Sequence, residues 1–552
     1  MTIEIRGKTC AVTGTLSKFT RDEVLKRLKA MGAITSASVS SKTDILFIGK
    51  GVGSKLAKAR RWGVTIYNED QLHALLEGRT EAVAALETAP KAPEQVALND
   101  ALQEFRQILY DDPTARTWQK ISDLIDRCPP ESLEMALEYV EGHIGRWGGE
   151  IWFDRWSSDH PEHPDLREAP RQWVEEILQG NFSPKHGLAR VFRFGNRNLV
   201  GKLAQRITED PWLTRATFLD MSHNKSLPAT FFKQLGQTGR LSTLSHLSLT
   251  ECRLNPSAAR ALVEAESLSN LTHLSLHGVD FKDGAAKELS SATRWTKLRF
   301  FDASYSRSAE GVEGFLATPC VSSLETLKLE AIGVGAALGE VLRDAGRMTR
   351  LRKLSVSYNA LGSAGGLSLS RADHLKGLTS FSASNNGLNV DAVEALVQSG
   401  ILDEVEQLDL ACNPLGHAAA LALGKLSNIN NLSVSRAGLD DSAAMALIES
   451  SFAHRLTSLH MGENALGDDF VRALANATHI KGLKWLTLYN TQITDEGIEA
   501  LANAPHLASL EDLYLTSAHL TPRSLALIEA SPFLSEGARK TGSRNLRVAR
   551  AT

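Results

Sequence analysis

Leucine and other apolar residues recur at a fixed spacing along the second half of the chain. The pattern L-x-x-L-x-L-x-x-N begins at twelve positions, with most steps 27 residues long and all between 24 and 28. It predicts that positions 1, 4 and 6 of each unit point into a core from a short strand, and that a helix follows. One unit cannot bury its apolar face alone, so the units must stack. The first positions are Ala216, Leu244, Leu271, Leu298, Leu324, Leu351, Leu378, Val405, Ile429, Leu456, Leu483 and Leu510.

A degenerate unit is expected before these twelve, because Leu188, Val191 and Asn196 lie one 28-residue step earlier. We assign the array to residues 186–535. Its period, the asparagine at position 9 and the helical second halves resemble leucine-rich repeats of the ribonuclease-inhibitor class. The resemblance implies a horseshoe-shaped solenoid with a concave sheet.

The concave face is where the array is expected to bind a protein. The fifth positions are small and polar through the middle of the array, and aromatic residues arrive late. Because Trp and Tyr contribute most to interface energies, the predicted protein-binding residues are His460, Trp485, Tyr489 and Tyr514. The alternative is a solvated strand face with ordinary aromatic packing. The histidines His246, His273 and His277 have no metal or nucleophile spacing and are expected at the surface.

The first 80 residues alternate strand-like and helix-like runs. Strands are predicted at 9–12, 43–48 and 64–67, and helices at 21–31, 54–62 and 69–76, which indicates a small, mostly parallel α/β domain. Two turns of this domain are suited to an anion. Thr13 and Gly14 follow the first strand, Arg21 opens the first helix, and Lys55 opens the second. Taken alone, these are also common turn residues.

The same residues lie within a longer resemblance. GKTCAVTGTLSKFTRDEV, followed by MGAITSASVSSKTDILFIGKGVGSKLAKARRWGVTIYNEDQLHALL, resembles the BRCT domain of NAD-dependent DNA ligases and of the large subunit of replication factor C. The resemblance implies that Thr13, Gly14, Arg21 and Lys55 form a pocket for the 5'-phosphate of a DNA end. Many BRCT domains place a tryptophan in the last helix, and here Leu72 is the candidate to fill that space.

Between the two ends we predict a linker at 81–98, rich in Ala, Glu and Pro, and a helical cap domain at 99–185. Six of the nine tryptophans lie between residues 118 and 212, which favours an aromatic core over a ligand cage. The cations of residues 181–206 alternate with Phe182, Phe192 and Phe194. Such a stretch can bind single-stranded nucleic acid, or its phenylalanines can pack under the cap. Residues 159–163, DHPEH, are expected to be a surface loop.

Charge is distributed unevenly along the chain. The total is 61 Lys and Arg against 64 Asp and Glu, a net charge of −3. Residues 1–80 carry fourteen basic and seven acidic side chains, a net of +7, and the basic C-terminal tail, 536–552, carries +4. The remainder therefore carries −14, so the near-neutral total does not argue against a polyanionic partner.

The predicted fold class is multidomain α/β: a BRCT-like domain at 1–80, a helical cap and a leucine-rich repeat solenoid. The five cysteines form no CxxC pair and no long apolar run or leader is present, so we expect a cytoplasmic protein without disulfides, metal or membrane contact. No catalytic motif or cofactor signature is found, and Lys282-Asp283-Gly284 lacks the spacer of an adenylation site.

The expected function is that of a non-enzymatic adaptor in DNA repair or replication. Its partners would be a DNA 5'-phosphate end or a phosphorylated protein at the BRCT-like domain, and an unidentified protein on the repeats. Two alternatives remain: an interaction or signalling scaffold with no nucleic-acid role, and a regulator of an enzyme such as a GTPase.

Overall fold

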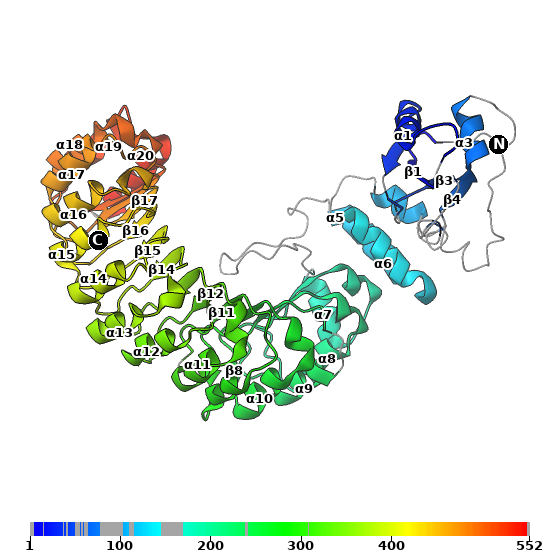
Figure 1. Ribbon diagram of the computed structural model, residues 1–552, viewed down its shortest axis with the longest axis horizontal. Helices are drawn as coiled ribbons and strands as arrows, with labels where there is room; N and C mark the ends of the chain where they lie inside the picture. Colours follow the sequence, from blue (N-terminus) through cyan, green and yellow to red (C-terminus); the bar gives the residue numbers. More distant parts are fainter. Residues whose placement is uncertain are drawn as a thin grey trace. The chain divides into compact units, whose positions relative to one another are not determined.

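The structure is a computed structural model (Figure 1). It describes residues 5–14, 16–36, 38–39, 42–49, 56, 59, 64–77, 103–109, 115–144, 169, 171–237, 241–306 and 308–548. The chain divides into two compact units, Met1–Glu176 with Asn181–Val191, and Ile177–Gly180 with Phe192–Thr552.

The first unit begins with a parallel four-stranded sheet of order β2-β1-β3-β4. The strands are β1 (Thr9–Thr13), β2 (Ile34–Ser36), β3 (Ile45–Ile48) and β4 (Thr65–Asn68), and the helices α1 (Arg21–Ala30) and α3 (Glu69–Leu76) follow β1 and β4. Both helices begin at a capping box, Thr20 with Glu23 in α1 and Asn68 with Gln71 in α3. Strand β2 is a short edge strand without an alternating pattern, and hydrophobic spacing does not predict it.

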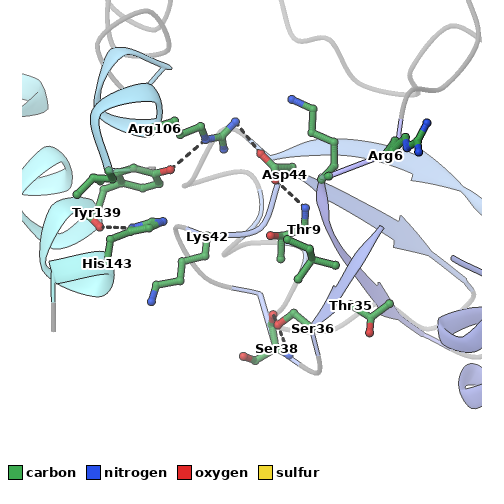
Figure 2. Close-up of a pocket in the computed structure, with 14 residues that line it drawn as sticks. Arg6, Thr9, Thr35, Ser36, Ser38, Lys42, Asp44, Arg106, Tyr139 and His143 are labelled. Carbon is green, nitrogen blue, oxygen red and sulfur yellow. Dashed lines mark hydrogen bonds and ion pairs between the residues drawn. The ribbon is translucent and has the colours of Figure 1, made fainter. Parts of the chain in front are cut away.

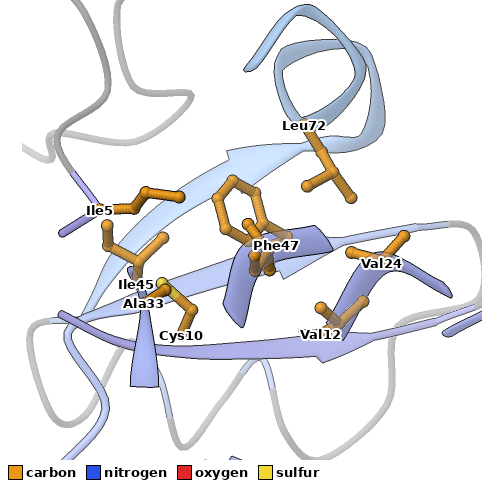
Figure 3. Close-up of a cluster of buried hydrophobic side chains, with 9 residues drawn as sticks. Ile5, Cys10, Val12, Val24, Ala33, Ile45, Phe47 and Leu72 are labelled. Atoms are coloured by element: carbon orange, nitrogen blue, oxygen red, sulfur yellow. The ribbon is translucent and has the colours of Figure 1, made fainter. Parts of the chain in front are cut away.

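The core of this sheet forms around Phe47 of β3, which is completely buried (Figure 3). Leu72 of α3, Val24 of α1 and Cys10 of β1 pack in the same cluster. Leu72, the predicted candidate to fill the space of a tryptophan, is therefore buried in this core. Burial and the nearby Asp44 carboxylate raise the pKa of the Cys10 thiol to about 12.

Helices complete the first unit. Residues 103–109 are helical, and α5 (Ala115–Asp126), α6 (Pro130–Ile144) and most of α7 (Arg171–Gln179) follow. Trp118 and Trp173 contact each other with ring centroids 5.4 Å apart. The two tryptophans thus form part of a packed core, as the aromatic composition predicts. Trp147, Trp152, Trp156 and the 159–163 loop lie outside the described residues.

The second unit is a solenoid built on a parallel sheet of thirteen strands that runs from β5 to β19 in chain order. In Figure 1 the strands line the inner face of the curved stack and the helices lie along its outer face. Equivalent leucines face one another across the ladder, for example Leu327 with Leu354 and Leu459 with Leu486. The strands are β5 (Val191–Arg193), β6 (Phe218–Asp220), β7 (His246–Ser248), β9 (His273–Ser275), β11 (Phe300–Asp302), β12 (Thr326–Lys328), β13 (Lys353–Ser355), β14 (Ser380–Ser382), β15 (Gln407–Asp409), β16 (Asn431–Ser433), β17 (Ser458–His460), β18 (Trp485–Tyr489) and β19 (Asp512–Thr516).

The outer layer consists mostly of α-helices, as predicted, and the unit beginning at Leu271 differs. Its second half is a 3-10 helix, η5 (Ala285–Ser291), preceded by the left-handed residues Asp283 and Gly284. That turn uses residues that would otherwise begin an α-helix. The α-helices are α8 (Lys202–Glu209), α9 (Ala229–Gln237), α10 (Pro256–Glu264), α11 (Ala309–Leu316), α12 (Ala337–Asp344), α13 (Gly362–Leu369), α14 (Val390–Gln398), α15 (Gly416–Leu423), α16 (Asp441–Ile448), α17 (Asp468–Asn476), α18 (Asp495–Ala502), α19 (Pro522–Ala530) and α20 (Glu536–Val548).

Where position 9 is an asparagine, its side chain holds the turn that follows the strand. The Asn386 amide donates to the carbonyl oxygen of Val356 at 2.9 Å, and its oxygen accepts the backbone N–H of Asn359 at 3.0 Å. The residue before the asparagine is left-handed in many units, as Asn385 is with φ of 51°. Its N–H extends the ladder to the next repeat, for Asn385 by donating to the Ala411 carbonyl. The asparagines therefore replace hydrogen bonds that the turning backbone cannot make.

Most of the predicted basic tail is the helix α20, which covers the last strand. The N–H of Leu513 in β19 donates to the Thr541 hydroxyl at 3.0 Å, and Ala538 and Leu546 are buried. An uncovered edge strand promotes association with other chains, and α20 protects this one. Within the described residues, no helix has the length and apolarity needed to cross a membrane.

Candidate functional site

The first predicted site lies at the carboxyl edge of the amino-terminal sheet. Thr13 is the last residue of β1 and pairs with Ile48, the last residue of β3, and its carbonyl accepts the N–H of Gly49 at 2.8 Å. Gly14 follows with φ of 85°, a conformation that favours glycine. The sequence after β1 and the sequence after β3 therefore begin side by side. Lys55, the fourth predicted residue, lies outside the described residues.

Arg21 is the first residue of α1 and is exposed. Its position at a helix N-terminus adds the positive end of the helix dipole to the charge of the guanidinium. The structure thus puts Thr13 and Gly14 at one end of the loop from β1 to α1, and Arg21 at the other.

Two contacts hold this loop, and sequence reasoning missed both. The backbone N–H and hydroxyl of Ser17 both donate to the Glu69 carboxylate at the start of α3, the hydroxyl at 2.8 Å. These bonds lower the pKa of Glu69, the backbone bond most. Phe19 stacks on His73 with ring centroids 5.0 Å apart, and the Arg27 guanidinium lies over the Phe19 ring. An acid 52 residues away along the chain gives no sequence signal of such a role.

The basic stretch at 181–206 is paired with acidic and aromatic partners. Lys185 makes ion pairs with Asp126 at 3.2 Å and Glu176 at 2.9 Å. Arg190 contacts the Glu141 carboxylate, and Phe192 and Phe194 are completely buried. Single-stranded nucleic acid needs exposed aromatic faces beside available cations. The structure therefore favours the packing interpretation of this stretch.

The second predicted site lies on the last strands of the solenoid. Trp485 and Tyr514 are each 42% exposed, and the rings of Tyr489 and Tyr514 meet edge to face at 5.7 Å. His460 is half-buried: its Nδ1 hydrogen-bonds the Thr487 hydroxyl at 3.1 Å, and burial lowers its pKa. Gly462 leaves the space for Tyr489, because a Cβ there would lie 2.3 Å from the ring.

The histidines earlier in the array correct one expectation. His246 is buried rather than at the surface, and its ring stacks on His273 at 3.9 Å. Phe218 and Phe300 extend the stack on either side. Identical positions on neighbouring strands lie close enough for rings to touch, and this packing buries His246 and half-buries His273. In the described part of the chain, no three His, Cys, Asp or Glu side chains gather as a metal site would require.

Comparison with known family models agrees with the amino-terminal sheet domain and with the repeat solenoid. Residues 5–76 match the BRCA1 C Terminus (BRCT) domain, and residues 348–370 match the Leucine Rich repeat. The chain thus carries an amino-terminal BRCT domain and a carboxyl-terminal leucine-rich repeat solenoid.

Three curated relatives match a short stretch of this chain. DNA ligases of Agrobacterium fabrum, Rhizobium etli and Rhodopseudomonas palustris are 53%, 51% and 49% identical to this chain over 74 residues. That stretch is 13% of this chain and 10% of each ligase, so the chain spans about a tenth of these relatives.

Two solved structures align with the larger part of the chain. An internalin (inlF) from Listeria monocytogenes is 16% identical, with a TM-score of 0.40 over 64% of this chain and 95% of that one. The yeast Rad7 and Elc1 complex gives 17% identity and a TM-score of 0.40 over 62% and 88%.

Proposed function

We propose that this protein is a non-enzymatic adaptor whose BRCT domain binds the 5'-phosphate of a DNA end and whose repeats bind a protein. The observation that carries the proposal is the loop from β1 to α1, where Thr13 and Gly14 end a strand and Arg21 begins a helix. The 53% identity to a DNA ligase over this domain supports a DNA ligand over a phosphorylated protein.

The chemistry of the proposed pocket is electrostatic. Backbone N–H groups at the start of α1 would donate to phosphate oxygens, and Arg21 would add a bidentate, charge-assisted contact. Lys55 is assigned to the same phosphate by the BRCT resemblance. The remaining positive charge of residues 1–80 would contact the adjacent backbone, so affinity should fall with salt, at a slope of about −0.9 per phosphate contacted.

The test compares the full-length protein on two duplexes that differ in one group, a 5'-phosphate or a 5'-hydroxyl. Tighter binding to the phosphorylated end is expected. Arg21→Glu and Lys55→Glu should each reduce it by about tenfold or more, the loss of a charged hydrogen bond. Lys29→Glu is the matched control, since Lys29 is exposed at the opposite end of α1. Equal affinity for the two ends in the unaltered protein would refute the proposal.

The repeat arm is tested separately. Trp485→Ala with Tyr514→Ala should remove the partner captured by the intact chain, because exposed aromatic residues dominate interface energies. Gln407→Ala, an exposed residue of β15, is the control. Retention of the partner by the double variant would place the binding surface elsewhere on the repeats.

A further inference from the structure

A hollow in the first unit lies at the opposite end of the sheet from Thr13. It has a volume of about 800 Å³. Thr9 and Ile34, the first residues of β1 and β2, line it together with Asp44, which directly precedes β3. All these strands are parallel, so the hollow is at their amino edge and the loop of the proposed 5'-phosphate site is at their carboxyl edge.

Helical residues beyond the BRCT match form the other wall. Figure 2 shows Arg106, Tyr139 and His143 on this side, across from Thr9, Asp44 and Lys42. Arg106 connects the walls: it donates from Nε to the Tyr139 hydroxyl at 3.0 Å and makes an ion pair with Asp44 at 2.6 Å. The second Asp44 oxygen accepts the N–H of Thr9 at 2.7 Å.

The charge of the lining is strongly positive. Four cationic side chains, Arg6, Lys8, Lys42 and Arg106, line the hollow, and Asp44 is the carboxylate among the described lining residues. The net lining charge is therefore +3 before His143 is counted. Both Asp44 oxygens already accept bonds from the protein, so this carboxylate is not available to a cationic ligand.

Hydrogen-bonding groups accompany the charge. The lining includes the hydroxyl-bearing residues Thr35, Ser36 and Ser38. Tyr139 holds His143 through its carbonyl, 2.9 Å from Nδ1, so Nδ1 is the protonated donor. Cations mixed with hydroxyl and imidazole groups suit phosphate oxygens, which accept several hydrogen bonds at once. The volume lies in the range of sites that enclose small ligands.

We propose that this hollow is a second anion site, which binds phosphate groups independently of the 5'-phosphate pocket. The phosphates can come from an internal segment of a nucleic-acid strand or from a free polyphosphate compound. The binding chemistry is the same for both: Lys8 and Lys42 neutralise the phosphate charge, and Arg106, held by Asp44 and Tyr139, presents its guanidinium in one orientation.

The test uses the full-length protein with two probes, inorganic tripolyphosphate and a single-stranded oligonucleotide with a 5'-hydroxyl, measured by calorimetry. Lys8→Glu with Lys42→Glu should weaken binding of tripolyphosphate by about tenfold or more. Lys29→Glu is the charge-matched control and should change it little. Competition by the oligonucleotide assigns the site to nucleic acid, and its absence assigns the site to small polyphosphates.

Arg21→Glu separates this proposal from the previous one. It should abolish the preference for a 5'-phosphate and leave tripolyphosphate binding unchanged. Hydrogen exchange provides a measurement that does not depend on a variant, since the probe should protect amides at residues 34–36, 42–45 and 103–109. Absence of probe binding by the unaltered protein, absence of that protection, or equal losses in Lys29→Glu and the double variant would overturn the second site.

Discussion

At the scale of single residues, hydrogen bonds to buried asparagines hold the turns of the solenoid. Asn386 is 1% exposed, and its side chain bonds backbone groups of the preceding repeat and of its own repeat. A buried N–H or carbonyl without a partner costs about 1–3 kcal/mol. Where the ninth position is an asparagine, its amide both donates and accepts, which neither aspartate nor leucine can do, and other units carry other residues there, such as Cys252 and Ile332.

Asn386→Ala should destabilise the solenoid by about 2–4 kcal/mol, because it leaves at least two buried backbone groups unsatisfied. Unfolding in urea, followed by circular dichroism, measures the loss. Gln407→Ala removes an exposed amide from the next strand and should change stability by less than about 0.5 kcal/mol. Equal effects of the two substitutions would contradict the structural role of the ladder.

The buried cysteines should resist modification. Burial raises the pKa of Cys10 and of Cys252 to about 12 each. A raised thiol pKa lowers the fraction of reactive thiolate at pH 8. In the native protein, iodoacetamide should therefore modify the half-buried Cys412 before either of them, and all should react in urea. Mass spectrometry of the labelled peptides measures the order, and early labelling of Cys10 would contradict the burial of this strand.

An ion pair on the inner face should make stability depend on pH. His277 lies 3.7 Å from Asp302, whose hydrogen bond raises the pKa of the imidazole. Burial alone would raise the pKa of Asp302, and the bonds from His277 and Ser304 lower it instead. Because the histidine pKa is raised in the folded state, the pair stabilises the fold fully below the unfolded pKa of about 6.5. This stabilisation is lost as pH rises through the folded pKa. The stabilisation from Asp302 is lost as pH falls through its own lowered pKa.

Raising the pH from 5.5 to 8.5 should thus lower the free energy of unfolding of the unaltered protein by up to about 1 kcal/mol, which is the contribution of a partly exposed ion pair. His277→Gln should abolish that part of the change. The comparison is the difference between the two proteins in urea midpoint at each pH, because half-buried histidines such as His374, whose pKa is lowered, have the opposite dependence. A pH profile unchanged by the substitution would show that the pair contributes nothing.

At the scale of elements, close contacts between neighbouring helices set the repeat spacing. A Cβ on Gly339 of α12 would lie 2.1 Å from the Gly365 carbonyl oxygen of α13. Backbone cannot yield at that distance, so Gly339→Ala should cost about 1–3 kcal/mol, which exceeds the gain in helix propensity of up to about 1 kcal/mol.

Gly346→Ala is the matched control for this prediction. A Cβ at Gly346 meets nothing within 4 Å, so the substitution should be neutral or slightly stabilising. Thermal unfolding of both variants decides the matter, and a neutral Gly339→Ala would mean that the helices can separate without cost.

The repeat spacing also shows what sequence could predict. Leucines at positions 1, 4 and 6 predicted the strands because every unit repeats them. Helix α13, GSAGGLSL, contains three glycines and is a poor helix former on its own. It is helical because Leu369 is buried and small residues allow close packing. The 3-10 helix η5 likewise depends on a turn at Asp283 that the repeat pattern does not contain.

In the candidate sites, too, the local sequence pattern predicts some features, and contacts formed on folding determine the others. The BRCT resemblance predicts Thr13, Gly14, Arg21 and Lys55 as a phosphate pocket, and this stays a prediction. Trp485 and Tyr514, predicted from their repeat positions, are exposed. Contacts between distant residues were not predictable: Ser17 with Glu69, Arg190 with Glu141, and Arg106 with Asp44. Each joins two segments whose approach depends on the folded chain.

At the scale of the whole molecule, each unit has its own core, and this predicts separate responses to core substitutions. Phe47 is buried in the BRCT sheet and Phe381 in β14 of the solenoid, each with 1% exposure or less. Truncating either to alanine should cost about 3–5 kcal/mol in the unit that contains it, because the lost contacts are all made within that unit's sheet and helices.

Hydrogen exchange of the full-length protein distinguishes the units. Phe47→Ala should accelerate exchange in peptides from residues 5–76 and leave residues 348–548 protected, and Phe381→Ala should do the reverse. In a repeat array, stability passes between nearest neighbours, so the effect of Phe381→Ala should be largest in the repeats beside β14 and decline with distance from it. If either substitution removed protection from both regions, the two units would fold as one cooperative body, and binding at the BRCT domain would then alter the stability of the repeats.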